Sequence, residues 1–294
     1  MILITGASGL AGRAVLDEVR KANAASKIPV KAMYRNASDA QKASGVDTVI
    51  ADFADSSSLK EALKGVHTAY VVCSPTPELV QLESNFIDAA RESGVRHIVL
   101  SSALGAGEYP KSFPSWHRKV EDKLKASGLA YTILRPGGFL QNITTYYAPT
   151  IRSLNAFYAA MNAAKVSLID VRDVAAVAAK ALLAPGAHAG KTYELGGPEA
   201  LSCAEIAKRI SKAIGRTVQY VNLPEAALRK SMTEAGAPPW LVDAELDLEL
   251  YYQMEGKSAE VNDTLPKLLC RTSIGIDQFL KENKDSFRSQ AAGA

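Results

Sequence analysis

The sequence predicts an α/β protein with a doubly wound parallel sheet, followed by a smaller C-terminal α+β lobe. Short apolar segments rich in β-branched residues alternate with segments of helical period through the first half of the chain. Three glycines, Gly6, Gly9 and Gly12, stand between the first such strand and the first helix. Strands separated by helices of this length require crossover connections, so we expect parallel strands with helices on both faces.

The expected elements follow one another regularly up to residue 134. Helix 56–64 begins at an N-cap, Asp55 or Ser56, and two other helices end at Gly94 and Gly128. The remaining segments in this half are strands 2–5, 30–34, 47–51, 67–73, 97–101 and 131–134, and helices 14–22, 79–92 and 115–126. Beyond residue 138 the expected elements are a strand-helix unit at 166–183, strands 192–195 and 218–223, and helices 203–214, 224–236 and 239–254.

The glycine-rich turn predicts a dinucleotide site. Gly6 permits a tight reversal, Gly9 lets the backbone approach a phosphate, and Gly12 lets the helix pack close to the strand. Backbone N–H groups and the helix dipole then favour an anion. The spacing differs by one residue from G-x-G-x-x-G, and an ordinary tight turn is the alternative. The predicted pyrophosphate site is Gly6, Ala7, Ser8, Gly9, Leu10, Ala11 and Gly12.

The end of the second strand indicates the nucleotide preference. Proteins that bind NAD commonly place a carboxylate there, whereas this chain has Arg35 and no carboxylate until Asp39. An arginine pairs with the 2′-phosphate of NADP, so we expect NADP(H) to be preferred over NAD(H). The alternative is a solvent-exposed loop arginine. Asp52 and Phe53 follow the third strand and are expected either to contact adenine or, for Asp52, to cap a helix.

Composition excludes several classes of function. The 294 residues are 47% hydrophobic and 22% charged, with a net charge of +3, which does not suit a dedicated nucleic-acid binder. Cys73, Cys203 and Cys270 are far apart, which fits reduced thiols and neither a disulfide framework nor a zinc site. No signal peptide and no apolar run of ~18 residues is present, so we expect a cytoplasmic protein that does not enter the membrane.

These signals together predict the domain organisation. Residues 1–150 are expected to form a nucleotide-binding domain, completed by part of 165–197. Residues 198–288 are expected to form a smaller substrate-binding lobe, and 289–294 a disordered tail. A monomer and a homodimer are both compatible with the sequence.

The chain resembles the NmrA-like atypical short-chain dehydrogenases/reductases, which include NAD(P)H:quinone oxidoreductases and triphenylmethane reductases. The resemblance covers nearly the whole chain. The carriers are ITGASG at 4–9, Arg35, Ser101–Ser102, HRKVE at 117–121, SGLAYTILRPGGF at 127–139 with Asn142, and DVRDVA at 170–175. It implies a Rossmann fold and a bound dinucleotide, with the backbone of Gly137, Gly138 and Phe139 near the nicotinamide. Further cofactor contacts are expected at the strand ends, at Cys73, Ser74, Ser101 and Pro136.

The usual catalytic residues of the wider superfamily are missing. Its members carry a Tyr four residues before a Lys at the start of the fifth helix. Aligned on Glu121, those positions hold Phe113 and His117, and the usual catalytic serine falls at Ala103. A phenylalanine cannot donate a proton, so simple carbonyl reduction is not expected. With an unperturbed pKa of about 6.5, His117 is a candidate proton donor; hydrogen bonding to the cofactor ribose and plain packing are its alternatives.

Candidate substrate residues are Ser102, Asn142 and Tyr146. Asn142 either lines the substrate mouth or caps the next helix. Tyr146 and its neighbour Tyr147 either stack on an aromatic substrate or belong to the core of the lobe. Asp170 and Asp173 are interpreted as structural.

Conjugated acceptors suit a site without a strong acid, because a quinone spreads the arriving charge over its own π system. The sequence therefore predicts an NADPH-dependent reductase that transfers hydride directly to a quinone or similar acceptor, without flavin or metal. The alternative is an NAD(P)-binding redox sensor that contacts a regulatory partner and does not turn over.

Overall fold

The computed structural model describes residues 1–254 and 257–288. The predicted disordered tail, 289–294, lies outside the described residues. The chain divides into two compact units. The first unit comprises Met1–Pro136 and Val171–Glu194, and the second comprises Gly137–Asp170 and Leu195–Ala294. These boundaries differ from the expected limits at 150 and 198, and the assignment of one part to cofactor and the other to substrate stays a prediction.

A seven-stranded sheet in the order β3-β2-β1-β4-β5-β6-β9 forms the centre of the first unit. Neighbouring strands from β1 to β6 pair in parallel. The order reverses between β1 and β4, which is where open α/β sheets bind ligands at the carboxyl edge. The strands are β1 Ile2–Ile4, β2 Val30–Tyr34, β3 Asp47–Ile50, β4 Thr68–Val71, β5 His97–Ser101, β6 Ala130–Pro136 and β9 Lys191–Leu195.

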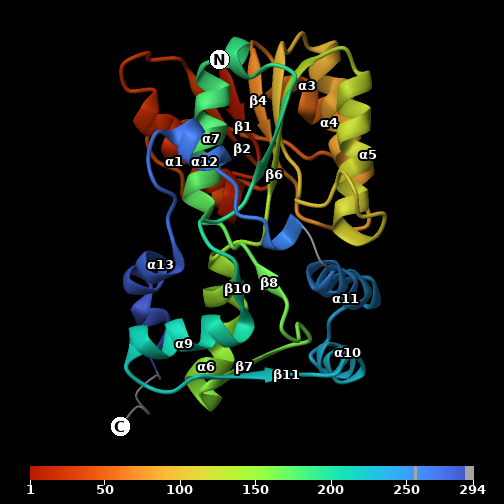
Figure 1. Cartoon of the computed structure of the whole chain (residues 1–294). Helices are drawn as coiled ribbons and strands as arrows, with labels where there is room; N and C mark the ends of the chain where they lie inside the picture. The colour runs from red at the N-terminus through yellow and green to blue at the C-terminus, as the bar shows by residue number, and fades with distance from the viewer. Residues whose placement is uncertain (255–256, 289–294) are drawn as a thin grey trace. The chain divides into compact units, whose positions relative to one another are not determined.

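Helices cover both faces of this sheet (Figure 1). Helix α1, Leu10–Ala22, packs against α7, Val171–Leu183. The other face carries α3, Ser56–Ala62, α4, Leu79–Glu92, and α5, Ser112–Ala126. Every residue of β1, β4 and β5 is buried, as a parallel sheet covered on both sides requires. The predicted doubly wound α/β fold is therefore confirmed.

Two pairs of short strands organise the second unit. Strand β7, Ala156–Ala159, pairs in parallel with β11, Gln219–Asn222. Strand β8, Lys165–Val166, pairs antiparallel with β10, Leu201–Ser202. The helices are α6 Ala148–Leu154, α9 Cys203–Ile214, α10 Glu225–Glu234, α11 Pro239–Gln253, α12 Thr264–Leu269 and α13 Ile276–Glu282, with a π-helix η1 at Ile143–Tyr147. Their core includes Phe157, Ile206, Ile210, Phe279, Leu280 and Phe287.

Local chemistry explains where several of these elements begin and end. Helix α9 starts with a capping box, in which Ser202 and Glu205 satisfy each other's backbone N–H groups, and it ends at Gly215 in the left-handed region. Helix α5 begins at Ser112, three residues before the expected start. Pro114 lies in its first turn, where an N–H has no partner within the helix, so the proline does not prevent helix formation there.

The expected strand-helix unit at 166–183 is split between the two units. Its strand, β8, pairs with β10 in the second unit, and its helix, α7, packs on α1 in the first. Strand β7, the π-helix η1 and helix α6 were not expected. Their hydrophobic residues show no clear period, and they are stabilised by tertiary contacts such as the stack of Tyr147 on Phe157.

The structure also bears on the cysteines, on metal binding and on membrane-spanning helices. The three cysteines are free thiols. Within residues 1–254 and 257–288, no cluster of three or more His, Cys, Asp or Glu side chains is placed to hold a metal ion. No helix in the same residues combines the length and apolar character needed to cross a membrane.

Glu83 on α4 is a buried carboxyl group in the first unit. Its side chain is fully buried, and neither carboxylate oxygen has a hydrogen-bond partner. Burial raises its pKa to about 8, so the group is mostly protonated at neutral pH. In the unfolded chain the same group ionises at its ordinary, lower pKa. The native state therefore binds the extra proton, and this residue makes stability fall as pH rises towards 8.

We expect Glu83→Gln to raise the free energy of unfolding at pH 8 by roughly 1 to 3 kcal/mol, because the neutral amide removes the cost of protonating or burying the carboxylate. At pH 5 the gain should be much smaller. Urea unfolding at both pH values measures the difference. Glu92→Gln, a change at an exposed glutamate of the same helix, is the control. A gain in stability that is the same at both pH values would contradict the protonated state of Glu83.

Candidate functional site

The turn after β1 holds the amino end of α1 at the carboxyl edge of the sheet. Gly6 has φ of +60°, a conformation that favours glycine, and its carbonyl accepts from Gly9 N–H at 2.9 Å. Thr5 fixes the strand before it, because its hydroxyl accepts from Val72 N–H at 3.0 Å, next to the end of β4. A Cβ at Gly12 would lie 2.1 Å from the Gly6 carbonyl oxygen, so only glycine allows this approach of helix to turn.

Gly9 differs from the other two glycines because the protein itself does not require it. Gly9 is the N-cap residue of α1, with an extended backbone and no side chain to cap the helix. A Cβ there would meet only the Gly6 carbonyl oxygen, at 3.4 Å, which is an ordinary contact. The amino end of the 13-residue helix α1 is thus left without a covering side chain. Its N–H groups and the helix dipole are suited to an anion such as a pyrophosphate.

Arg35 directly follows β2 and is exposed. Among the described residues it makes no ion pair and no hydrogen bond. Asp39, the first carboxylate after it, contacts Asn36 and Lys42, and these hydrogen bonds lower the pKa of Asp39. Sequence reasoning missed a second cation, Arg13, whose charge also lowers the pKa of Asp39. Arg13 directly follows Gly12, and this position was the available signal.

The two residues after β3 are tied into local structure. Asp52 accepts from Ala54 N–H at 2.8 Å, while Asp55 is the N-cap of α3. Phe53 is buried, and its ring packs on Phe86 with centroids 5.0 Å apart. Asp52 therefore does not cap helix α3. Its side chain stabilises a local turn before the helix instead. Phe53 belongs to the core, so its ring is not free to stack on a base.

Cys73, Ser74 and Ser101 lie at or just beyond the carboxyl ends of β4 and β5. Burial raises the pKa of the Cys73 thiol to about 12, helped by the nearby carboxyl of Glu83. Cys73 is therefore a neutral thiol. Ser74 is exposed, while Ser101 is buried. Of the three side chains, only that of Ser74 is fully open to solvent.

Ser102 is part of a buried ionic network. Its hydroxyl donates to Glu121 at 2.7 Å, and Glu121 accepts two further bonds from the Arg135 guanidinium, at 2.8 and 2.7 Å. Glu194 and Lys125 extend the network at 3.2 Å each. Despite desolvation by burial, hydrogen bonds from Arg135 and Ser102 lower the pKa of Glu121, which stays ionised. The Ser102 hydroxyl donates its proton within this network, and its predicted contact with substrate stays a prediction.

Helix α5 carries His117 and Phe113. The ring of Phe113 is buried and meets Trp116 edge-on, with centroids 5.3 Å apart. His117 Nδ1 is buried and has no hydrogen-bond partner within the protein. Burial lowers the pKa of His117 to about 4, against the opposing charge of Glu121. The imidazole is therefore neutral at physiological pH, and the expectation of an unperturbed pKa is wrong.

Pro136 ends the described β6 in the first unit, and the three residues after it belong to the second. Gly137 N–H donates to the Leu195 carbonyl at 2.9 Å, and Phe139 forms a parallel bridge with Ile169. A Cβ at Gly138 would meet Leu168 at 3.0 Å and the Tyr252 hydroxyl at 3.3 Å. Close packing within the second unit is thus a sufficient reason for glycine at 138.

Asn142 precedes the π-helix η1 and makes no side-chain cap, so its predicted capping role is not observed. Tyr147 stacks on Phe157 at 4.4 Å and belongs to the core of the second unit. Tyr146, its neighbour in sequence, is 66% exposed. Consecutive residues of a helix point in different directions, so one tyrosine packs in the core while the other faces solvent. π-Helices occur frequently at functional sites, and Tyr146 remains available for an aromatic ligand.

Comparison with known proteins identifies similar chains. The model of the NmrA-like family matches residues 1–288. An NAD(P)H azoreductase of Xenophilus azovorans is 37% identical over 292 residues, covering 98% of this chain and 99% of the relative. Quinone oxidoreductase 2 of Escherichia coli is 33% identical over 272 residues, covering 92% and 93%. A crystal structure of that NADPH-dependent quinone oxidoreductase with NADPH has a TM-score of 0.86 at 30% identity, covering 96% of this chain and 99% of the other.

Proposed function

We propose that this chain, which belongs to the NmrA-like family and is an NAD(P)H-dependent oxidoreductase, transfers hydride from NADPH directly to a quinone or a similar conjugated acceptor. The observation that carries the proposal is the uncovered amino end of α1 at the point where the strand order reverses. The similarity to an azoreductase and to a quinone oxidoreductase supports an aromatic acceptor. Cytoplasmic location is part of the same proposal.

The first unit contains groups that are suited to binding a dinucleotide. The pyrophosphate would lie against the N–H groups at the start of α1, where Gly9 presents no Cβ. The exposed Arg35 guanidinium, with Arg13 as a second cation, would pair with the 2′-phosphate. A free ribose hydroxyl would find no carboxylate at the end of β2, because Asp39 pairs with Lys42 at 3.2 Å. These features favour NADP(H) over NAD(H).

The choice of acceptor follows from the missing acid. A ketone that accepts hydride becomes an alkoxide and needs a protonated group in the transition state. Phe113 is expected at the position of the usual tyrosine, and the carboxylate of Glu121 is paired with Arg135. A quinone delocalises the charge by itself. We propose that the neutral imidazole of His117 does not act as an acid and only donates a hydrogen bond, to the cofactor or the acceptor.

Bound NADPH supplies the hydride, which carries two electrons and one proton. The quinone gains these at one end of its conjugated system, and solvent supplies the second proton that completes the hydroquinone. NADP⁺ is the other product, because NADPH loses the two electrons that the quinone gains. No flavin or metal is needed in this scheme, and this too is part of the proposal.

The variant Gly9→Val tests whether the turn after β1 binds the pyrophosphate. The new side chain would stand where the pyrophosphate must approach, while its Cβ has room beside the Gly6 carbonyl in the free protein. We expect NADPH binding to be lost in isothermal titration calorimetry and the thermal unfolding midpoint of the free protein to change little. Ordinary NADPH affinity in the folded variant would exclude this turn as the pyrophosphate site.

Arg35→Ala tests the nucleotide preference. Losing one charge-assisted contact should weaken NADPH by ~1.5–3 kcal/mol and leave NADH nearly unchanged. Dissociation constants for both nucleotides, measured by calorimetry, give the comparison. The control is Arg91→Ala, which removes an exposed arginine of α4 that faces Asp88. If both nucleotides weakened equally in Arg35→Ala, the residue would not contact the 2′-phosphate.

A comparison of acceptors tests the reaction. With purified, flavin-free protein we expect NADPH oxidation with a small quinone to be at least 10²-fold faster than with an aliphatic ketone, which is the usual contribution of general acid catalysis. NADPH absorbance follows both reactions. If ketone reduction were as fast as quinone reduction, the site would have to contain a proton donor, and the proposal would be wrong. Tight NADPH binding without turnover on quinone or azo acceptors would instead identify a redox sensor.

A further inference from the structure

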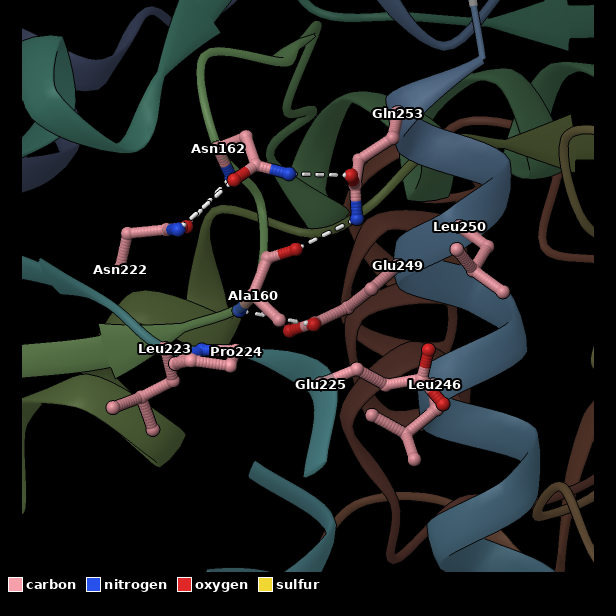
Figure 2. A pocket seen from close by; sticks show the side chains of 10 residues that line it. All are labelled: Ala160, Asn162, Asn222, Leu223, Pro224, Glu225, Leu246, Glu249, Leu250 and Gln253. Atoms are coloured by element: carbon pink, nitrogen blue, oxygen red, sulfur yellow. Dashed lines mark hydrogen bonds between the residues drawn. The ribbon is translucent and has the colours of Figure 1, made fainter. Parts of the chain in front are cut away.

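A cavity of about 380 Å³ lies wholly within the second unit. Its walls are one side of α11, the segments that follow β7 and β11, and the first residue of α10 (Figure 2). The volume falls in the range of small-molecule sites. None of its lining residues belongs to the turn, to Arg35 or to the α5 residues described above.

One wall is a closed network of amide groups. The Asn162 side chain donates to Gln253 at 2.7 Å and accepts from Asn222 at 2.9 Å. Gln253 in turn donates to the Ala160 carbonyl at 2.7 Å. Figure 2 shows these bonds linking the loop after β7 to the last turn of α11. The wall is therefore preorganised, which reduces the entropy lost when a ligand binds.

Two carboxylates supply the charge of the cavity. Glu249 on α11 accepts from Ala160 N–H at 3.0 Å, which engages one oxygen of the carboxylate. Glu225, at the start of α10, has only Arg229 nearby, at 4.0 Å, and that arginine pairs more closely with Asp243, at 2.6 Å. Among the described residues that line the cavity there is no Lys, Arg or His. Both carboxylates retain unfilled acceptor capacity.

The surroundings of Glu249 add no positive charge. The titratable groups that interact with it are Glu245 on the same helix and Cys203, Tyr147 and Tyr220 on the elements packed against it. Burial raises the pKa of each of the thiol and phenol groups, so these stay neutral. Helix α11 carries four acidic residues and no basic one, although the whole chain has a net charge of +3. The local field therefore attracts cations.

Apolar side chains complete the lining. Leu246 and Leu250 lie one turn apart on α11, and Leu223 faces the cavity from the end of β11. Leu250 is 43% exposed, so its side chain is accessible to a ligand that enters the cavity. A ligand that suits this cavity needs a hydrocarbon body as well as a charge.

We propose that this cavity binds an organic monocation, with an ammonium group against Glu249 and Glu225 and a hydrocarbon body against Leu246 and Leu250. An organic anion would face two carboxylates without a compensating base. A neutral ligand would leave the half-buried Glu249 without a charged partner. A bare metal ion needs several clustered side-chain ligands. The described residues contain no cluster of three or more His, Cys, Asp or Glu side chains that could hold one. The site is independent of the proposed reductase function.

The probe is benzylammonium, titrated into the full-length protein at pH 8 by isothermal titration calorimetry. Benzyl alcohol and benzoate, which share its aromatic body, are the neutral and anionic comparisons. We expect saturable binding of benzylammonium alone. Comparable binding of benzyl alcohol, or no saturable binding of benzylammonium, would overturn the proposal.

Two variants test which carboxylate binds the ammonium group. Glu249→Gln keeps an oxygen for Ala160 N–H but removes the charge, and we expect it to weaken benzylammonium binding about 10-fold or more. Glu225→Gln should have a smaller effect because Glu225 is exposed. The matched control is Glu234→Gln at the other end of α10, a charge change outside the cavity. Unchanged affinity in Glu249→Gln, or an equal loss in Glu234→Gln, would overturn the site.

The pH dependence provides an independent readout. Burial raises the pKa of Glu249 to about 7, and binding of a cation requires its ionised form. We therefore expect affinity to fall about 10-fold between pH 8 and pH 6, and this dependence to disappear in Glu249→Gln. A variant that kept the wild-type pH dependence would exclude Glu249 as the contact.

Discussion

The close approach of Gly12 to the Gly6 carbonyl is the constraint on which the arrangement of the first unit depends. No side chain fits between them, since a Cβ at Gly12 would lie 2.1 Å from that oxygen. The contact fixes the amino end of α1 against the end of β1, where the strand order reverses. Helix α7 then packs on α1, and the sheet is closed on that face. The helix dipole and free N–H groups are thereby directed at one edge of the sheet without any functional side chain.

A buried ion network links helix α5 to the strands β5 and β6. Arg135 from β6 holds Glu121 of α5, and Glu121 holds Ser102 next to β5. Removing one partner of such a network leaves a buried charge uncompensated, so it constrains the positions of helix and strands. It also makes these groups unavailable for proton transfer. What remains nearby on α5 is a neutral imidazole with an unpartnered nitrogen.

The two units differ in how they present charge. The first exposes cations, Arg13 and Arg35, after the glycine turn and after β2. The second gathers carboxylates along α11 and around its cavity. The small net charge of the chain does not reveal this local difference, because it sums charges that are spread over both units. An anionic nucleotide and an organic cation would therefore be directed to different units.

The sequence by itself determined the first unit almost completely. Alternating buried strands and amphipathic helices specify a doubly wound sheet, and residues 203–214 form the expected helix because its capping box and terminal glycine are local signals. The predictions for the glycine turn and Arg35 rest on the same kind of local signal, since each needs only a neighbouring strand and helix to be interpreted. The family was identified from motifs spread over the chain, and the matching family model confirms it.

Tertiary structure alone decided what depends on burial and on partners distant in sequence. Nothing local shows that Ser102 is bonded to Glu121, that Phe53 packs on Phe86, or that desolvation moves the pKa of His117 to about 4. The exposed Tyr146 and the stacked Tyr147 are adjacent residues of one type, and only the packing of their helix decides which of them is buried. The cavity beside α11 combines residues up to 93 positions apart, such as Ala160 and Gln253. Desolvation and long-range contacts arise only when the chain packs, and a linear pattern does not contain them.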